Sequence, residues 1–322
     1  MAPAPKKLVS VILVNWNGRR YLADALLSLY RQTYTPLEII VVDNASTDGT
    51  VDYLEAEHPG VLLIKNPENY GFCKANNQGI RISRGSYILL MNPDVRLEED
   101  FIEKAVQVAE SEEGIGMVGG KLLTVKDPTC IDTTGIVLEK TRRAFDRGQG
   151  EPDKGQFDQM EEVFGISGAA CLCKREMLEA VKVQEEYLDE LFFAYKEDID
   201  LSWRARLVGW KCVYTPSAVA YHDRTWSTGN RRQVPFWIRR HSLKNRYLLL
   251  LKNDRWSEIR PCLKDLLWYE LKSLGYILFR EPHLFLALFQ VIRLLPQALK
   301  KRAVIQKGAK AGKEDLIQWF YR

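Results

Sequence analysis

Carboxylates that follow apolar runs are the residues of this sequence best suited to chemistry. Asp94 ends the run SYILLMNPD, directly after Asn92 and Pro93. A lone carboxylate there could cap a helix expected to begin near Leu97. It could instead ligate Mg²⁺ or Mn²⁺, since hard cations prefer oxygen ligands. One carboxylate does not hold such a cation alone, so the second interpretation requires further ligands from elsewhere in the chain or from a bound diphosphate.

Other polar residues also stand where apolar runs end. Asp43 closes LEIIVVD, and its carboxylate could accept the N3–H of a uracil or thymine ring, although Ser46 or Asp48 in the same turn could simply cap the next helix. Asn15 ends the first apolar run, and Asn69 could either reach a ribose or base or cap the helix that follows it. These positions predict a nucleotide site.

A cluster of acids, Glu197, Asp198 and Asp200, lies at the expected start of a helix. Such clusters commonly complement the positive end of a helix dipole. The functional alternative is a general base, since a carboxylate within hydrogen-bond distance of a hydroxyl can take its proton as a new bond forms. The preceding aromatic residues could form a floor for a sugar ring; they are Phe192, Phe193 and Tyr195.

His222 ends an expected strand, 24 residues after Asp198. A histidine at a strand end is more often a polar surface residue than a ligand. As a neutral imidazole it could also complete the cation site of Asp94.

Strand-like and helix-like segments alternate four times along the first third of the chain. The expected strands are 7–17, 36–46, 61–69 and 86–94, and the expected helices are 19–33, 47–59, 71–85 and 98–114. This alternation predicts an α/β fold with a mostly parallel sheet flanked by helices. Ligands of such sheets bind at the carboxyl ends of the strands, where the polar residues above are expected. Short strands, a Gly-rich loop, a helix at 199–208 and a strand at 211–222 follow.

Charge divides the chain into two regions. Residues 231–322 hold 20 Lys/Arg and 7 Asp/Glu, whereas residues 1–230 hold 26 and 35. We expect a catalytic domain over 1–230 and a helical, basic region over 231–322. No signal-peptide pattern is present, and no uninterrupted apolar run reaches the ~18–20 residues that span a bilayer. We therefore expect a cytoplasmic protein whose six cysteines are reduced.

Several motifs in a fixed order resemble family 2 of the glycosyltransferases, and more narrowly its rhamnosyltransferase-like members. They are VSVILVNWNGRRYLADALLSLYRQT, LEIIVVDNASTDGT, NYGFCKANNQGI, YILLMNPDV, EDIDLSWRARLVGW and YHDRTWS, within residues 8–230. The resemblance implies the nucleotide-diphospho-sugar transferase fold called GT-A, a divalent cation (Mg²⁺ or Mn²⁺) and inversion at the anomeric carbon.

The resemblance also implies roles for individual residues. Asp198 corresponds to the catalytic base, with Glu197 beside it at the acceptor, and Asp94 corresponds to the last acid of the family's D-x-D motif. His222 is implied at the metal or diphosphate. The implied nucleotide-binding residues are Asn15, Asp43, Asn69 and Asn92. Many members have Asp where this chain has Asn92, which leaves the identity of the metal open.

The resemblance suggests dTDP-rhamnose as the first candidate donor, with another donor such as a UDP-sugar as the alternative. The acceptor it suggests is a glycan or a polyprenyl-diphosphate-linked sugar, and the process is cell-surface polysaccharide synthesis. A glycoside hydrolase would leave the strand-end residues without a role, and a sugar nucleotidylyltransferase would normally have a Gly-rich loop after the first strand. We expect no nucleic-acid partner, because the body is acidic and carries no recognisable binding motif.

The basic tail mixes Arg and Lys with Trp, Phe, Tyr and Leu. Its helices could simply pack on the catalytic domain. They could also form an interfacial surface on anionic lipid, which predicts a peripheral position on the inner face of the cell membrane.

Overall fold

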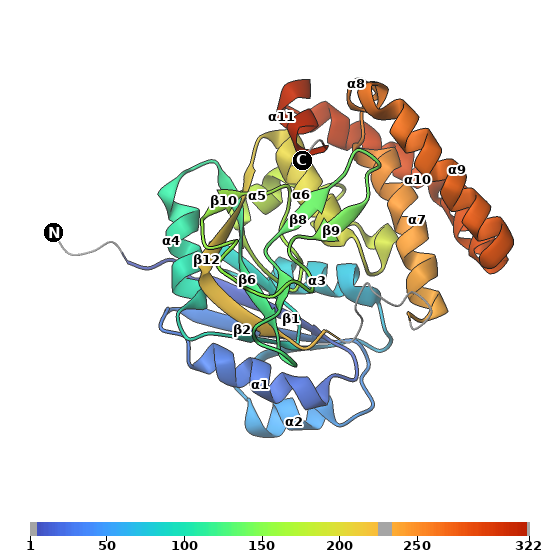
Figure 1. Ribbon diagram of the computed structural model, residues 1–322. Helices are drawn as coiled ribbons and strands as arrows, with labels where there is room; N and C mark the ends of the chain where they lie inside the picture. The colour runs from blue at the N-terminus through green and yellow to red at the C-terminus, as the bar shows by residue number, and fades with distance from the viewer. Residues whose placement is uncertain (1–4, 225–233, 321–322) are drawn as a thin grey trace.

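The computed structural model describes residues 5–224 and 234–320, and a ten-stranded sheet lies at its centre (Figure 1). The strand order is β10-β12-β6-β11-β4-β1-β2-β3, with β5 paired to β12 and β7 to β6. The strands are β1 (Val9–Asn15), β2 (Leu37–Asp43), β3 (Leu62–Lys65), β4 (Tyr87–Met91), β5 (Val95–Leu97), β6 (Ile115–Thr124), β7 (Ile131–Thr133), β8 (Ile136–Leu138), β9 (Ala144–Asp146), β10 (Glu161–Glu162), β11 (Ala170–Lys174) and β12 (Lys211–His222).

Helices cover both faces of the sheet and form the C-terminal region. They are α1 (Arg19–Tyr30), α2 (Thr50–Glu57), α3 (Gly71–Ile82), α4 (Phe101–Ser111), α5 (Arg175–Val181), α6 (Glu197–Val208), α7 (Phe236–Asn253), α8 (Trp256–Ile259), α9 (Leu263–Arg280), α10 (Phe285–Gly308) and α11 (Lys313–Ile317). Short 3₁₀ turns are η1 (Glu190–Phe192), η3 (Arg260–Cys262), η4 (Pro282–Leu284) and η5 (Gln318–Phe320).

The predicted architecture is confirmed. Strands β1, β2, β3 and β4 are parallel neighbours, and β11 runs antiparallel between β4 and β6. Alternate residues of β1 enter two cores: Val11 and Leu13 pack with α1 and α4, whereas Ile12 and Val14 pack with α3, α5 and α6. A strand buried on both faces requires such a continuous apolar run, and this is the pattern that the sequence shows.

The segment after Asp94 differs from its prediction. Residues Val95–Leu97 form β5, which pairs antiparallel with the end of β12, and the next helix begins only at Phe101. Val95 and Leu97 are buried while Arg96 between them is exposed, which is strand periodicity rather than helix periodicity. Asp94 therefore does not cap a helix that begins near Leu97.

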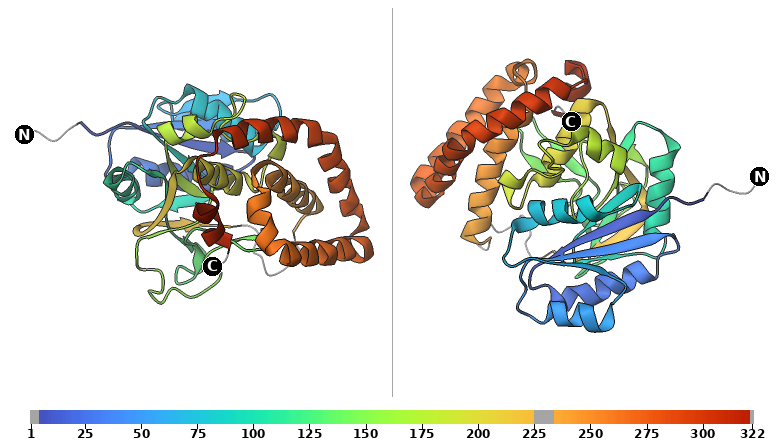
Figure 2. Two further views of the ribbon diagram at one scale, coloured as in Figure 1. Left: turned by 90° about the horizontal axis from the view of Figure 1, so that it is seen from above. Right: turned by 180° about the vertical axis from the view of Figure 1, so that it is seen from behind.

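The C-terminal helices lie at one side of the α/β body (Figure 2), where α10 packs against α7 and α6. Helix α9 buries only Ile277 among its side chains. The segment Pro282–Gly308 is long and apolar enough by composition to cross a membrane, and 22% of its apolar window is buried. The sequence prediction overlooked this segment because isolated polar residues interrupt its apolar run.

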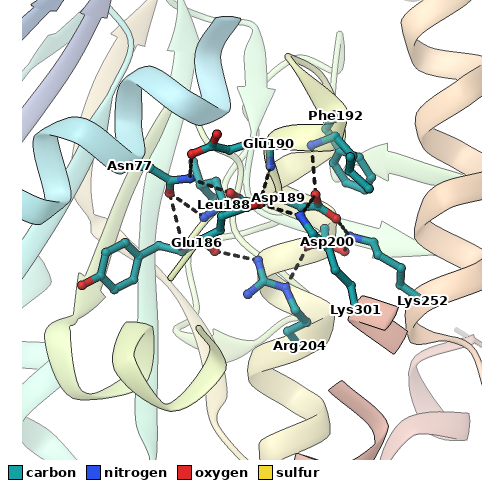
Figure 3. Close-up of polar contacts among 12 residues, drawn as sticks. Asn77, Glu186, Leu188, Asp189, Glu190, Phe192, Asp200, Arg204, Lys252 and Lys301 are labelled. Atoms are coloured by element: carbon teal, nitrogen blue, oxygen red, sulfur yellow. Dashed lines mark hydrogen bonds and ion pairs between the residues drawn. The ribbon is translucent and has the colours of Figure 1, made fainter. Parts of the chain in front are cut away.

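A buried network of charges joins these helices to the body (Figure 3). Lys252 of α7 contacts Asp189 and lies 2.8 Å from Asp200 of α6, which also binds Arg204 at 2.8 Å. Lys301 of α10 binds the other oxygen of Asp189 at 2.6 Å. Each of these side chains is at most 5% exposed. The two lysines keep the pKa of Asp189 well below its usual value in spite of burial.

Removal of Lys252 from this network should destabilise the fold. Lys252→Met leaves two buried carboxylates short of one cation, a change that typically costs about 3–5 kcal/mol. Urea denaturation followed by circular dichroism measures the change in unfolding free energy, with Lys300→Met, at an exposed position of α10, as the control. A Lys252→Met protein within about 1 kcal/mol of the wild type would show that the network contributes little to stability.

Candidate active site

Asn15 and Asp43 end β1 and β2 as direct neighbours in the sheet. The Asn15 amide donates to Asp43 Oδ1 at 3.1 Å and also contacts Ser46 and Thr50, while Asp43 Oδ2 accepts the Ser46 N–H at 2.8 Å. Both residues are buried. The Asn15 carboxamide oxygen is buried without a hydrogen-bond partner in the described part of the chain, so this pair retains acceptor capacity for a ligand.

Asn69 lies two residues before the start of α3 at Gly71. Its side-chain oxygen accepts the Gly71 N–H at 2.9 Å, as a helix-starting residue does. Gly71 has a φ of +81°, and a Cβ there would lie 2.5 Å from the Phe193 ring. Gly71 is therefore required by the packing of Phe193. A nucleotide role for Asn69 stays a prediction.

Asp94 meets His222, as the sequence predicted for a shared site. The pairing of β5 with β12 brings Asp94 Oδ1 to 3.4 Å from His222 Nε2. The other ring nitrogen, Nδ1, lies 2.8 Å from Asp132 of β7, and Arg224 binds both oxygens of Asp132 and also Asp146. His222 and Arg224 hold the pKa of Asp132 below its usual value against the opposing effect of burial.

These side chains fit a divalent cation that also binds a diphosphate. Asp94 supplies carboxylate oxygen and His222 a ring nitrogen, and a carboxylate on the far nitrogen of a ligand histidine is a common orienting contact. Burial is outweighed by the two carboxylate contacts, which raise the pKa of His222 to about 9, so a cation bound to Nε2 would replace a proton. Among the described residues, no group of three or more His, Cys, Asp or Glu could hold a metal, so further ligands would come from the substrate.

Asp198 begins α6, close to the chain at the start of β11. Its Oδ2 accepts the Gly168 N–H at 3.2 Å. Glu197 is buried, and its Oε2 has no hydrogen-bond partner in the residues described. Burial, reinforced by the charge of Asp198, raises the pKa of Glu197 to about 8. Glu197 therefore carries a proton at neutral pH, a state that the sequence analysis did not anticipate.

The segment before α6 is strained and held by α7. Phe193, Tyr195 and Lys196 have φ values of +67°, +73° and +70°, conformations that are costly for residues other than glycine. The buried Asn245 amide of α7 donates to the carbonyls of Phe192, Ala194 and Tyr195, at 3.0, 2.8 and 2.7 Å. These contacts offset part of the strain and fix the entry into α6.

Backbone contacts bring the candidate residues to one edge of the sheet. The two-residue segment 168–169 binds Asp198 through the Gly168 N–H and binds the Asn92 N–H through the Ala169 carbonyl, at 2.9 Å. Gly18 lies close to both Asn15 and the turn 92–94. A Cβ added to Gly18 would be 2.5 Å from Asn15 Oδ1 and 3.7 Å from Pro93. The turn 92–94 thus lies between the Asn15–Asp43 pair and Asp198.

Two residues that the sequence analysis considered together with Asp198 do not lie at this edge of the sheet. Asp200 is fully buried in the charge network with Arg204 and Lys252, so it stabilises the fold rather than facing a ligand. Phe192 is also fully buried, beneath the Lys252 ammonium at 4.3 Å, so it provides no floor for a sugar. Helical periodicity explains the position of Asp200, which lies two residues beyond Asp198 and points to another side of α6. Phe192 lies in η1, where it packs under Lys252 of α7.

Sequence reasoning missed Asp132, Arg224 and Asn245. Asp132 is the middle residue of the very short strand β7, between Ile131 and Thr133, and its neighbours in the sequence do not mark it as buried. Arg224 follows His222 by two residues in YHDR. Asn245 is a polar residue on the buried face of α7 and could have been identified from the helical spacing of that face.

Comparison with known proteins identifies relatives over most of the chain. The model of a family described as "Glycosyl transferase family 2" matches residues 10–182. An N-acetylglucosaminyl-diphospho-decaprenol L-rhamnosyltransferase of Mycobacterium tuberculosis is 27% identical over 250 residues, covering 69% of this chain and 78% of that protein. A putative teichuronic acid biosynthesis glycosyltransferase of Bacillus subtilis is 31% identical over 130 residues, covering 39% of this chain and 52% of that protein.

Solved structures share the fold at low sequence identity. A Staphylococcus aureus TarS fragment in complex with UDP aligns with a TM-score of 0.58 and 17% identity, over 93% of this chain and 88% of that one. GalNAc-T7 with UDP, GalNAc and Mn²⁺ aligns with a TM-score of 0.59 and 15% identity, over 76% and 48%. The sheet, its flanking helices and these neighbours confirm the GT-A fold.

The protonated Glu197 predicts a pH dependence of stability. The pKa of Glu197 is higher in the folded chain than in the unfolded chain, so the folded state binds the extra proton and stability falls as pH rises toward about 8. Between pH 5.5 and 7.5 the unfolding free energy of wild type should fall relative to Glu197→Gln, by at most about 1.4 kcal/mol per pH unit. Parallel pH profiles for the two proteins would contradict this assignment.

Proposed function

The chain belongs to glycosyl transferase family 2, and we propose that it is an inverting enzyme that moves a sugar from a nucleotide diphosphate to a lipid-linked acceptor. The first candidate donor is dTDP-rhamnose and the first candidate acceptor a sugar on polyprenyl diphosphate, as the name of the mycobacterial relative suggests. A UDP-sugar is the alternative donor. The proposed process is cell-surface polysaccharide synthesis.

The observation that carries the proposal is the single edge of the sheet shared by Asp198, the turn 92–94 and the Asn15–Asp43 pair. This arrangement supports a base at one end of a bound donor and nucleotide contacts at the other. A sugar nucleotidylyltransferase would leave Asp198 without a substrate hydroxyl. The substrate of a glycoside hydrolase contains no nucleotide, so Asn15 and Asp43 would have no nucleobase to bind. The transfer reaction gives each of these residues a role.

The proposed mechanism is direct displacement. Asp198 takes the proton of the acceptor hydroxyl, and the oxygen attacks the anomeric carbon on the face opposite the nucleotide, so that the bond to the diphosphate breaks and the configuration inverts. Asp43 and Asn15 orient the nucleotide, and Asp94 and His222 would hold the divalent cation. The bound cation would supply Lewis-acid neutralisation of the leaving diphosphate. Glu197, protonated, can donate a hydrogen bond to the acceptor.

We propose that the tail rests on an anionic membrane surface. Large apolar side chains are exposed along α9 and α10: Leu267, Trp268, Leu271, Leu274, Leu278, Phe279, Phe285, Leu286, Phe289 and Ile292. Basic residues accompany them, including Lys264, Lys272, Arg280 and Arg293. An apolar face bordered by cations binds anionic lipid interfaces, with about 1 kcal/mol added by each basic residue near the surface.

The contacts of α10 favour a position on the membrane surface over one across it. Lys301 is buried against Asp189, and Arg302 donates to the carbonyls of Leu251 and Asp254 at 2.8 and 2.7 Å. Insertion of Pro282–Gly308 across a bilayer would break these contacts and leave Asp189 without one of its two cationic partners. A tail that lies on the membrane preserves them.

Asp198→Asn tests the proposed base. Turnover should fall by about 10²–10⁴-fold because no carboxylate remains to take the hydroxyl proton, while the affinity for the nucleotide-sugar should change little. Steady-state transfer assays and calorimetric donor binding measure the two effects. Asp24→Asn, at an exposed position of α1, is the control. Turnover of the Asp198→Asn protein within a few-fold of wild type would assign the base to another group.

Sedimentation with vesicles tests the membrane surface. Wild type should pellet with phosphatidylglycerol vesicles at low salt and less at high salt, because the basic residues are screened. Phe279→Ser combined with Phe289→Ser should reduce the pelleted fraction, whereas Met160→Ser, at an exposed apolar position of a distant loop, should not. A wild-type protein that stays in the supernatant at low salt would contradict the proposal.

A further inference from the structure

An aromatic surface formed by the loop before α6 and the first turns of α7 has no role in the mechanism above. Tyr195 and Trp237 are 36% and 43% exposed, and their ring centroids lie 5.9 Å apart. Behind them, His241 stacks on Phe193 at 5.2 Å and meets the edge of Trp237 at 6.3 Å. Exposed aromatic rings offer apolar faces on which a ligand can stack.

The chain holds Tyr195 in place at a conformational cost. Its φ of +73° is unfavourable for a tyrosine, and the Asn245 amide fixes its carbonyl at 2.7 Å. Strained residues that the surrounding structure holds in place tend to occur at ligand sites. Tyr195 is three residues from Asp198, so their Cα atoms are at most about 11 Å apart. The aromatic pair is therefore within one or two sugar rings of the proposed base.

Two further groups of α7 adjoin this surface. Arg240 lies three residues after Trp237, on the same side of α7, and has no ion-pair partner among residues 5–224 and 234–320. Its Nε is buried without a hydrogen-bond partner in those same residues. Phe236 packs edge-on against His283 of η4, with centroids 4.6 Å apart. Helix α10 follows η4 immediately and begins with exposed apolar side chains.

We propose that these residues form an acceptor track, defined as Tyr195 and Trp237, then Arg240, then the exposed Phe285 and Phe289 of α10. The proposal rests on the transfer function above and assigns the three chemical parts of the acceptor. The acceptor sugar stacks on Tyr195 and Trp237, its diphosphate pairs with Arg240, and its isoprenoid chain lies on the start of α10.

The order of chemistry along the track favours this occupant. Aromatic, cationic and apolar groups are linked by contacts that lead from Tyr195 and Trp237, through Arg240 and Phe236, to His283 just before α10. A sugar linked through diphosphate to a hydrocarbon chain has its parts in the same order. A purely hydrocarbon ligand would have no use for Arg240, and a soluble glycan would have no use for Phe289. The apolar end also continues into the surface that we assign to the membrane, where such a chain would be anchored.

Equilibrium binding to the full-length protein in detergent tests the track with three synthetic probes. Each carries N-acetylglucosamine: one on a long polyprenyl diphosphate, one on a short-alkyl diphosphate, and one as a short-alkyl glycoside without phosphate. Trp237→Ala should weaken binding of all three by about 10-fold. Arg240→Gln should weaken only the two diphosphates, and Phe289→Ser only the polyprenyl probe. Tyr30→Ala, at the end of α1 and 52% exposed, should change none.

The outcomes separate the track from the function on which it rests. If wild type binds the probes but Trp237→Ala stays within twofold of it, the track is wrong and the transferase function stands. If Arg240→Gln weakens the phosphate-free glycoside equally, the diphosphate assignment is overturned. If wild type binds a nucleotide-sugar but none of the probes, the proposed acceptor class fails together with the track. Unchanged nucleotide-sugar affinity in Trp237→Ala excludes a general folding defect.

Discussion

The carboxyl edge of the parallel strands is the constraint on which the candidate site depends. Strands β1 and β2 end in register at Asn15 and Asp43, and β4 ends beside them just before the turn 92–94. Side chains that follow parallel strands have to emerge at the same edge, so residues distant in sequence become neighbours. The return of β12 along β5 adds His222 to that edge, and α6 adds Asp198 through Gly168.

A second set of contacts makes the C-terminal helices part of this arrangement. Lys252 of α7 and Lys301 of α10 neutralise carboxylates of η1 and α6, and Asn245 fixes the strained entry into α6. Buried charges of this kind tolerate the loss of a partner poorly. The position of the proposed base therefore depends on helices that the sequence marks only as basic and apolar. The same helices expose the surface that we assign to lipid, which links substrate location to catalysis.

The sheet and the residues at the ends of its strands could be predicted from sequence. The spacing of apolar residues, the length of each segment and the continuous apolar runs of buried strands can all be read from neighbouring residues. The pairing of Asp94 with His222 was one of two alternatives for a histidine at a strand end, and the family resemblance favoured it. The β5–β12 contact that brings the two residues together joins segments far apart in sequence. Asp200 was grouped with Asp198, and Phe192 was considered as a floor for a sugar, because sequence spacing does not reveal which of these side chains Lys252 buries. The roles of Asp132 and Arg224 depend on tertiary contacts that no local pattern encodes. Helical spacing marks Asn245 as buried but does not identify the carbonyls that it binds. The division at residue 230 stays a prediction.

The central claim is that one edge of the sheet binds a nucleotide-sugar together with a cation. Titration calorimetry of dTDP-rhamnose, UDP-glucose and GDP-mannose into the protein, with Mn²⁺ and after chelation, measures this most directly. The account predicts that one of these donors binds with Mn²⁺, that chelation weakens it, and that Asp94→Asn reproduces the effect of chelation. Donor binding that is indifferent to both Mn²⁺ and Asp94→Asn, or no donor binding at all, would contradict it.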